Sequence, residues 1–257
     1  MRNIPALLAS LLLAFPLLPQ MAAADPAPRL PPLSLRLLPG TEPSVLENLI
    51  HVRLVKGAGQ VTLQLDLAHK RILDGQGQIV VESDGTNPIS LQGTVDKWRY
   101  VQSLASLAAA HPQDIHIDPR SMPQEQLTPP LPRIYNNGEV TYVVTNVPAQ
   151  RQVAVFNLDA NGGIQLLAAR NSAQVSDDKV LIYAIVQPLF GVEHVVAVSA
   201  IDPARMQQFI AWLQETASAD GMIDTQGAIL EQIAALKDVR VGMATVYTCE
   251  SAAHCKR

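Results

Sequence analysis

Cysteine, aromatic residues and charge are all scarce in this sequence. The chain has 257 residues, of which two are cysteines, 4% are aromatic and 16% are charged. Both cysteines lie at the C-terminal end, which argues against a cysteine protease. The low aromatic content argues against a carbohydrate-binding surface built on stacking. A net charge of −4 without a basic stripe argues against nucleic acid or an anionic membrane as a partner.

Recognisable catalytic and ligand-binding motifs are also missing. The sequence has no G-x-S-x-G, no H-E-x-x-H and no G-x-x-x-x-G-K-[ST] segment, and the glycines of LDGQGQIV lack the spacing of a dinucleotide fingerprint. We therefore expect no enzymatic activity, no cofactor and no metal. Apolar residues make up 48% of the chain, which predicts a globular protein with a sizeable core.

The first residues of the chain indicate export. Arg2 precedes an apolar run from Ile4 to Leu18, and Ala22 and Ala24 occupy the small-residue positions of an A-x-A cleavage site. These features predict a signal peptide over residues 1–24. An uncleaved membrane anchor is the alternative, but the run is short for a membrane span. We expect the protein in the periplasm or secreted, without membrane insertion after signal cleavage.

The two cysteines, Cys249 and Cys255, lie close together in YTCESAAHC. In an oxidising compartment a pair at this spacing is expected to form a disulfide, worth about 2 kcal/mol from loop closure. A metal site that includes His254 is the alternative. Two thiols and one histidine are too few for a closed zinc site, so the disulfide is the favoured interpretation.

The mature chain divides into two regions with alternating apolar and polar residues, 25–121 and 133–257. A linker that contains several prolines, 122–132, separates them. In the first region, LIHVRLVKGAG and QVTLQLDLA are predicted to pair as a hairpin around Lys56–Gly59, and RILDGQGQIVVES to form two short strands. Apolar residues at three- and four-residue steps then predict a helix over Val95–Ala110.

The second region contains the strand-like runs EVTYVVTNV, QVAVFNLD, GGIQLLAA, KVLIYAIVQP and HVVAVSAI. Helices are predicted over Ala204–Ala219 and Thr225–Lys237, followed by a last strand in DVRVGMATVYTC. Asp202 is expected to cap the first of these helices, with Pro203 in its first turn. The sequence therefore predicts an α+β fold with β-sandwich-like antiparallel sheets and about three packed helices.

The segment VFNLDANGGIQLLAA, Val155 to Ala169, is typical of a β-hairpin. Its turn needs residues that tolerate a positive φ angle, and Asn161–Gly163 supplies them. Asp159 and Asn161 are also candidate calcium ligands, but the residues after the turn lack the acidic side chains that a calcium loop needs. We expect a plain turn.

The segment DIHIDP places Asp114, His116 and Asp118 on one face of a predicted strand. An envelope hydrolase that acts on a polymer could use these carboxylates with a buried His116 as acid and base. The simpler interpretation is the solvent face of an edge strand, with Ile115 and Ile117 buried.

Three segments follow one another: VDKWRYVQSLASLAAAHPQDIHIDP, GEVTYVVTNVPAQRQVAVFNLDANGGIQLLAA and VQPLFGVEHVVAVSA. Together they resemble the C-terminal portion of bacterial secreted or envelope proteins in which a caspase-like peptidase domain precedes a domain of unknown function, number 4384. Phe156–Leu167 and Pro188–Val198 carry the likeness most clearly, within Leu49–Ile201. The caspase-type QAC-x-G segment is absent from the sequence, so the catalytic residues of that family have no counterpart here.

The resemblance implies an accessory module that stands without the peptidase and contacts another envelope or secreted protein. We therefore expect a non-enzymatic binding or adaptor protein of the bacterial cell envelope; an inhibitor or immunity protein against a secreted toxin is an alternative. The expected contact surface consists of strand edges and turns. The candidate turns are Asn136–Gly138, Asp159–Gly163 and Phe190–His194. The candidate binding residues are Phe190, Glu193 and His194.

Overall fold

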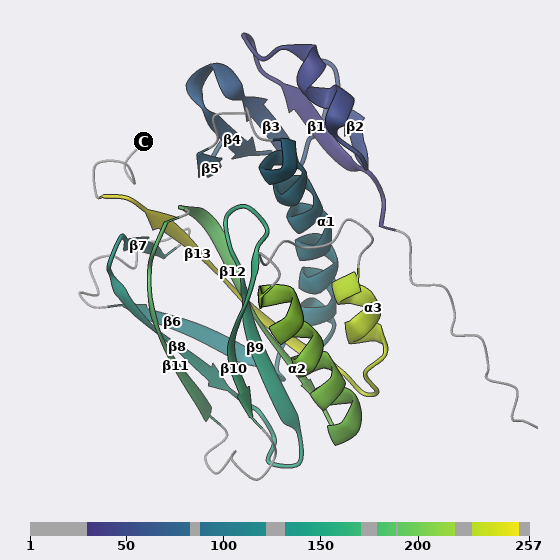
Figure 1. Ribbon diagram of the computed structural model, residues 1–257, viewed down its shortest axis with the longest axis vertical. Coiled ribbons are helices and arrows are strands. Elements are labelled where there is room, and N and C mark those ends of the chain that lie inside the picture. Colours follow the sequence, from purple (N-terminus) through teal and green to yellow (C-terminus); the bar gives the residue numbers. More distant parts are fainter. Residues whose placement is uncertain are drawn as a thin grey trace, which may run out of the picture.

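The computed structural model describes residues 30–82, 88–121, 132–170, 179–188, 190–218 and 228–251. The predicted signal peptide and residues 122–131 of the predicted linker lie outside these residues. The described elements form three layers, in which a small sheet and a group of helices cover opposite faces of a large sheet (Figure 1).

Within the described residues, the strands are β1 (Leu33–Leu37), β2 (Val52–Leu54), β3 (Leu63–Asp66), β4 (Arg71–Asp74), β5 (Ile79–Glu82), β6 (His116–Ser121), β7 (Arg133–Tyr135), β8 (Glu139–Thr145), β9 (Gln152–Leu158), β10 (Ile164–Arg170), β11 (Lys179–Ile185), β12 (Gly191–Ala200) and β13 (Arg240–Cys249). The α-helices are α1 (Pro88–Ala110), α2 (Pro203–Ser218) and α3 (Ala228–Ala234). Short 3-10 helices cover Pro43–Asn48 and Leu67–His69.

The large sheet has ten strands in the order β10-β9-β12-β5-β4-β3-β1-β2, with β13 paired to β12 and β7 paired to β13. The small sheet has three strands in the order β11-β8-β6. Most neighbours are antiparallel, which confirms the predicted α+β fold with sandwich-like antiparallel sheets and packed helices. Among the described strands, β10 lies at one edge of the large sheet and β11 at one edge of the small sheet.

Strands β9 and β12 are the centre of the structure because both of their faces are buried. Alternate residues such as Phe156 and Val196 pack against α1, α2 and α3. The residues between them, such as Val155 and Val195, pack against β6, β8 and β11 of the small sheet. A strand with two buried faces typically has a nearly continuous apolar sequence. β9 is such a strand, because it is buried along its whole length.

Two local predictions from the second region are confirmed. β9 and β10 pair as an antiparallel hairpin, and Gly162 in its turn has a φ of +93°. A β-carbon at Gly162 would also collide with the carbonyl oxygen of Gly93 in α1, so glycine allows the turn to approach the helix. At the start of α2, the Asp202 carboxylate accepts hydrogen bonds from the backbone amides of Ala204 and Arg205, as expected for a helix cap.

The predicted hairpin around Lys56–Gly59 is wrong. β2 and β3 do not pair with each other; each pairs in parallel with β1, which lies between them. Alternation identifies a strand but does not specify its partner, and β1 offers two edges that the two later strands occupy. The prediction for RILDGQGQIVVES is confirmed, because β4 and β5 pair in an antiparallel hairpin.

The first helix begins earlier than Val95, the predicted start. Thr94 already lies inside α1, where its hydroxyl donates to the carbonyl oxygen of Ser90. α2 matches the predicted Ala204–Ala219 closely, and α3 covers the central part of the predicted Thr225–Lys237.

The predicted regions 25–121 and 133–257 share both sheets. Strands β1 to β5 extend the large sheet through a single residue pair, Val81 with Gly191, and lie together at the top of Figure 1. Strand β6 precedes the linker but pairs with β8 in the small sheet. Helix α1 contributes buried residues to two core clusters, and each of these clusters contains residues of both regions.

Candidate functional site

A pocket of about 180 Å³ opens between the two sheets, and we refer to it as the inter-sheet pocket. Strands β8, β9, β10, β11 and β12 all contribute to its lining. Its polar lining residues are Tyr142, Asn157, Asp159, Gln165, Gln187 and Glu193. The apolar part of its wall includes Val140, Leu167, Ala184 and Pro188. The pocket therefore combines a polar cluster with an apolar wall.

Glu193 is the acidic centre of the polar cluster. One of its carboxylate oxygens accepts a hydrogen bond from the side-chain amide of Asn157 at 2.6 Å, and the other accepts one from the hydroxyl of Thr248 at 2.8 Å. These three residues come from β12, β9 and β13, which are neighbours in the large sheet. The adjacent strands thus fix the carboxylate in a single orientation.

Asn157 has a second polar atom that is not satisfied. Its side chain is 8% exposed, and its Oδ1 is buried without a hydrogen-bond partner among the described residues. An amide oxygen accepts up to two hydrogen bonds, and leaving a buried acceptor empty costs about 1–3 kcal/mol. Asn157 therefore has an unused acceptor in a residue that lines the pocket.

Asp159 uses one carboxylate oxygen to hold the β9–β10 turn. Its Oδ1 accepts hydrogen bonds from the amides of Asn161 and Gly163, both at 2.8 Å. The plain turn expected for Asn161–Gly163 therefore accounts for these residues. The same turn brings the Asp159 side chain to the rim of the inter-sheet pocket.

Lys97 of α1 lies on the other side of the large sheet from Glu193 and is fully buried. Its ammonium donates to the backbone carbonyl oxygens of Asp159 and Val192. Burial lowers the pKa of Lys97 to about 8, against the opposing effect of the Asp159 and Glu193 carboxylates. A buried lysine with a lowered pKa is more frequent at functional sites than elsewhere.

The pKa of Glu193 is raised, with burial as the main cause. The hydrogen bonds from Asn157 and Thr248 and the charge of Lys97 act in the opposite direction. Burial also raises the pKa of Tyr142, and the neighbouring Glu193 charge adds to that effect. The pocket therefore places the neutral phenol of Tyr142 beside the Glu193 carboxylate. The hydrogen bonds to this carboxylate and the charge of Lys97 only partly offset the cost of burying it.

The structure places the three candidate binding residues in different surroundings. Glu193 lines the inter-sheet pocket, whereas His194 points to the opposite face of β12, as adjacent strand residues do. His194 is 3% exposed and meets the ring of Trp98 edge-on, and burial lowers its pKa. Phe190 packs against the core between the sheets and does not line the pocket.

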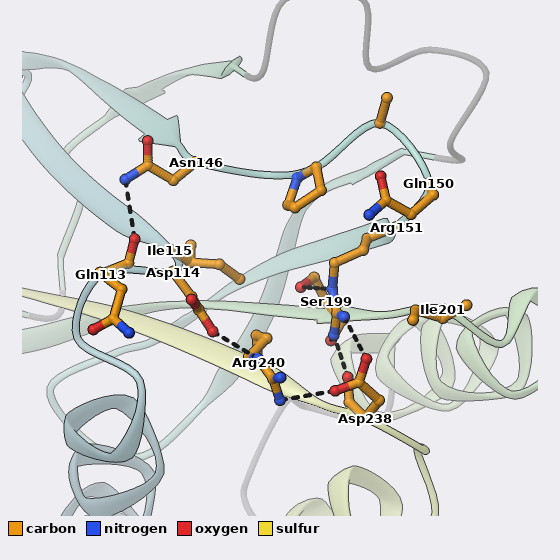
Figure 2. Close-up of a pocket in the computed structure, with 12 residues that line it drawn as sticks. Gln113, Asp114, Ile115, Asn146, Gln150, Arg151, Ser199, Ile201, Asp238 and Arg240 are labelled. Atoms are coloured by element: carbon orange, nitrogen blue, oxygen red, sulfur yellow. Dashed lines mark hydrogen bonds and ion pairs between the residues drawn. The ribbon is translucent and has the colours of Figure 1, made fainter.

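A larger and shallower cleft of about 680 Å³ lies where the β8–β9 loop, the α1–β6 loop and the start of β13 meet, and we call it the arginine cleft (Figure 2). Figure 2 shows Arg240 between Asp114 and Asp238. Arg240 contacts them at 2.6 and 2.9 Å. The lining of the cleft contains two arginines and two aspartates. Each of them takes part in an ion pair, so the net charge of the cleft is close to zero.

Arg151 holds the floor of the arginine cleft. Its guanidinium donates to the hydroxyl and carbonyl oxygens of Ser199 at 3.0 Å, and to the carboxylate and carbonyl oxygens of Asp238. The same contact lowers the pKa of Asp238. Because Arg151 is buried and its bonds connect the residue before β9 to the end of β12 and to the segment before β13, we assign the network a structural role.

Replacing Arg151 with alanine is expected to lower the free energy of unfolding by about 2 kcal/mol, because it leaves buried acceptors without donors. The matched control is Arg120→Ala, which breaks an exposed pair with Asp118 and is expected to change stability by less than about 1 kcal/mol. Urea unfolding of both variants measures the difference. Equal losses in the two variants would contradict the structural role of Arg151.

The carboxylates proposed for a hydrolase do not gather around a buried histidine. Asp114 lines the arginine cleft, Asp118 pairs with Arg120 on the outer face of the small sheet, and His116 is exposed on β6. Ile115 and Ile117 are buried, as the edge-strand interpretation expects. The arrangement offers no shared cleft in which these three groups could act together.

Across the described part of the chain, no three histidine, cysteine or acidic side chains cluster closely enough to hold a metal ion. None of the helices described combines the length and apolar character needed to cross a membrane. Cys249 ends β13 and is buried, whereas Cys255 lies outside the described residues, so the disulfide stays a prediction.

Comparison of this chain with family models, curated proteins and solved structures finds no match. The resemblance to domain of unknown function 4384 therefore stays a prediction. Of the site residues, sequence analysis identified Glu193 and Asp159 but missed Tyr142, Asn157 and Lys97. A signal existed for Lys97, which lies four residues before Val101 and seven before Leu104 on the buried stripe of α1.

Proposed function

We propose that this chain is an exported, non-enzymatic binding or adaptor protein of the bacterial cell envelope. We further propose that it captures an extended segment of another envelope or secreted protein, which adds as a strand to the edge of β11. The leader-like residues 1–24 support export. The resemblance of Leu49–Ile201 to an accessory domain supports an adaptor role.

One observation carries this proposal: the outward face of β11 is an exposed apolar stripe. Leu181, Tyr183 and Ile185 alternate along the strand and are 53%, 78% and 59% exposed. Single exposed apolar residues are common on protein surfaces, but three in a row on one strand face are a feature of contact sites. We call these three residues the β11 stripe.

The position of β11 in the small sheet adds the second requirement for strand addition. Among the described strands, β11 pairs only with β8, so its other edge offers backbone donors and acceptors. Strand addition obtains affinity from such main-chain hydrogen bonds and specificity from alternate side chains. Native proteins protect exposed edges with charge, proline or bulges. β11 has one charged residue, Lys179 at its start, and the rest of the strand, Val180–Ile185, has no charge, proline or bulge.

Site-specific photocrosslinking in the native envelope tests the proposal. With a benzophenone amino acid at position 183, we expect one discrete covalent adduct, because the residue would lie in the contact. The matched control places the same amino acid at Ile50, which is 49% exposed but distant from β11 in sequence and sheet order.

A partner identified from the position-183 adduct is then challenged with a Leu181→Asp version of the crosslinking chain. A charge in the β11 stripe is expected to reduce the adduct at least tenfold while the circular dichroism spectrum stays unchanged. Equal adducts from positions 183 and 50, or no adduct from either, would overturn the proposed function.

A further inference from the structure

The inter-sheet pocket has acidic groups and no basic group in its lining. Its charged lining residues are Asp159 and Glu193. The cation that acts on them, Lys97, approaches from α1 and donates to two backbone carbonyls behind the pocket. An entering group meets carboxylate, amide and phenol oxygens. This set of acceptors favours a positively charged ligand with several N–H donors.

The unpartnered Oδ1 of Asn157 is an independent sign of a missing donor. Asn157 is more than nine-tenths buried, and its amide nitrogen is already used by Glu193. Asn157 lines the pocket, and its remaining oxygen is buried and has no donor among the described residues. A ligand N–H that bonds this oxygen would at the same time lie beside the Glu193 carboxylate, because the two side chains are in contact.

The size and the wall of the pocket limit the ligand further. A volume of about 180 Å³ exceeds the roughly 30 Å³ that one water molecule occupies in the liquid. Leu167, Ala184 and Pro188 supply apolar contacts between the polar end and the surface. A short alkyl chain with a cationic head matches this layout, because such chains bury their methylenes and bond through their tips.

We propose that the inter-sheet pocket binds an alkylammonium or alkylguanidinium group, carried by a lysine or arginine side chain of the strand that docks on β11. This inference rests on the proposed function. The two edge strands β10 and β11 both line the pocket, so it lies at the side of the sandwich where a strand would add. Ala184 of β11 faces the space between the sheets and is small, which leaves room for an inward side chain of an added strand.

Titration with small probes tests the pocket without any partner protein. The full chain, purified from the periplasm of an expression host, is titrated with n-butylamine hydrochloride and with n-propylguanidine hydrochloride and followed by amide NMR. Both are expected to shift the side-chain amide of Asn157 and the signals of Gln165 and Glu193 with millimolar affinity. The neutral probe n-butanol is expected to leave these signals unshifted.

Glu193→Gln keeps the shape of the side chain and removes its charge, and it is expected to weaken both cationic probes at least tenfold. Glu231→Gln, an exposed change on α3, is the control and is expected to bind as the wild type does. Ala184→Leu provides a second variant, which fills the pocket from β11 and is expected to abolish the shifts while leaving Glu193 in place.

Three results would overturn the inference: equal shifts with butanol, unchanged affinity in Glu193→Gln, or no shift with either cation. These outcomes are separable from those of the crosslinking test at positions 183 and 50, because neither position lines the pocket. An adduct at position 183 with no cation binding removes the pocket inference alone. Cation binding without any adduct removes strand docking as the source of the ligand and leaves a site for a free amine or guanidine.

Discussion

Replacing Phe156 with alanine is expected to destabilise the protein by about 4 kcal/mol, the largest effect we predict for a single substitution. Phe156 is fully buried at the centre of β9, where it packs on the helix side of the large sheet. Its ring meets the ring of Phe209 edge-on, with 6.2 Å between the two ring centroids. Truncation would leave a cavity between two rigid layers that cannot close around it.

The matched control for this prediction is Tyr183→Ala, which truncates an aromatic strand residue that is 78% exposed. We expect this control to change stability by less than about 0.5 kcal/mol. Urea unfolding monitored by circular dichroism measures both variants. A loss of less than about 1.5 kcal/mol for Phe156→Ala would contradict the two-sided burial of β9.

The contribution of Lys97 to the stability of the protein is expected to rise between pH 8 and 10.5. Its pKa is about 8 in the folded state, compared with 10.5 for an ordinary lysine. In this interval the unfolded chain binds the Lys97 proton and the folded chain does not, so the free energy of unfolding increases with pH. A difference of this size corresponds to about 3 kcal/mol over the interval.

Other groups titrate in the same interval, so the wild type must be compared with Lys97→Met. The difference in unfolding free energy between the two proteins is expected to grow in favour of the wild type by about 3 kcal/mol from pH 7.5 to 10.5. A difference that stays constant with pH would contradict the lowered pKa of Lys97 in the folded protein. If Lys97→Met does not fold, NMR titration of the Lys97 side chain in the wild type measures its pKa directly.

Local signals in the sequence predict the elements whose contacts are also local. The β9–β10 hairpin follows from alternation on both sides of Asn161–Gly163, and α2 follows from its Asp202 cap. Parallel pairing of β1 with β2 and β3 joins residues that alternation does not connect. Its absence from the prediction reflects the fact that a strand's pattern specifies its buried face and not its neighbour.

The candidate site was only partly predictable for the same reason. Glu193 was recognisable as an acidic residue within an apolar strand, but its partners Asn157 and Thr248 lie on two other strands and become neighbours only in the folded sheet. Tyr142 comes from the opposite sheet. The candidate binding residues Glu193 and His194 lie on opposite faces of β12, because adjacent residues of a strand face opposite sides.

The pattern of photocrosslinking along β11 tests the central claim, that an extended partner segment docks on this strand, most directly. With the benzophenone amino acid placed in turn at Leu181, Tyr183 and Ile185, we predict adducts with the same partner at all three positions. The exposed apolar positions Ile50 and Ile201 are predicted to give none. Adducts that appear at Ile50 or Ile201 but not along the β11 stripe would contradict the account.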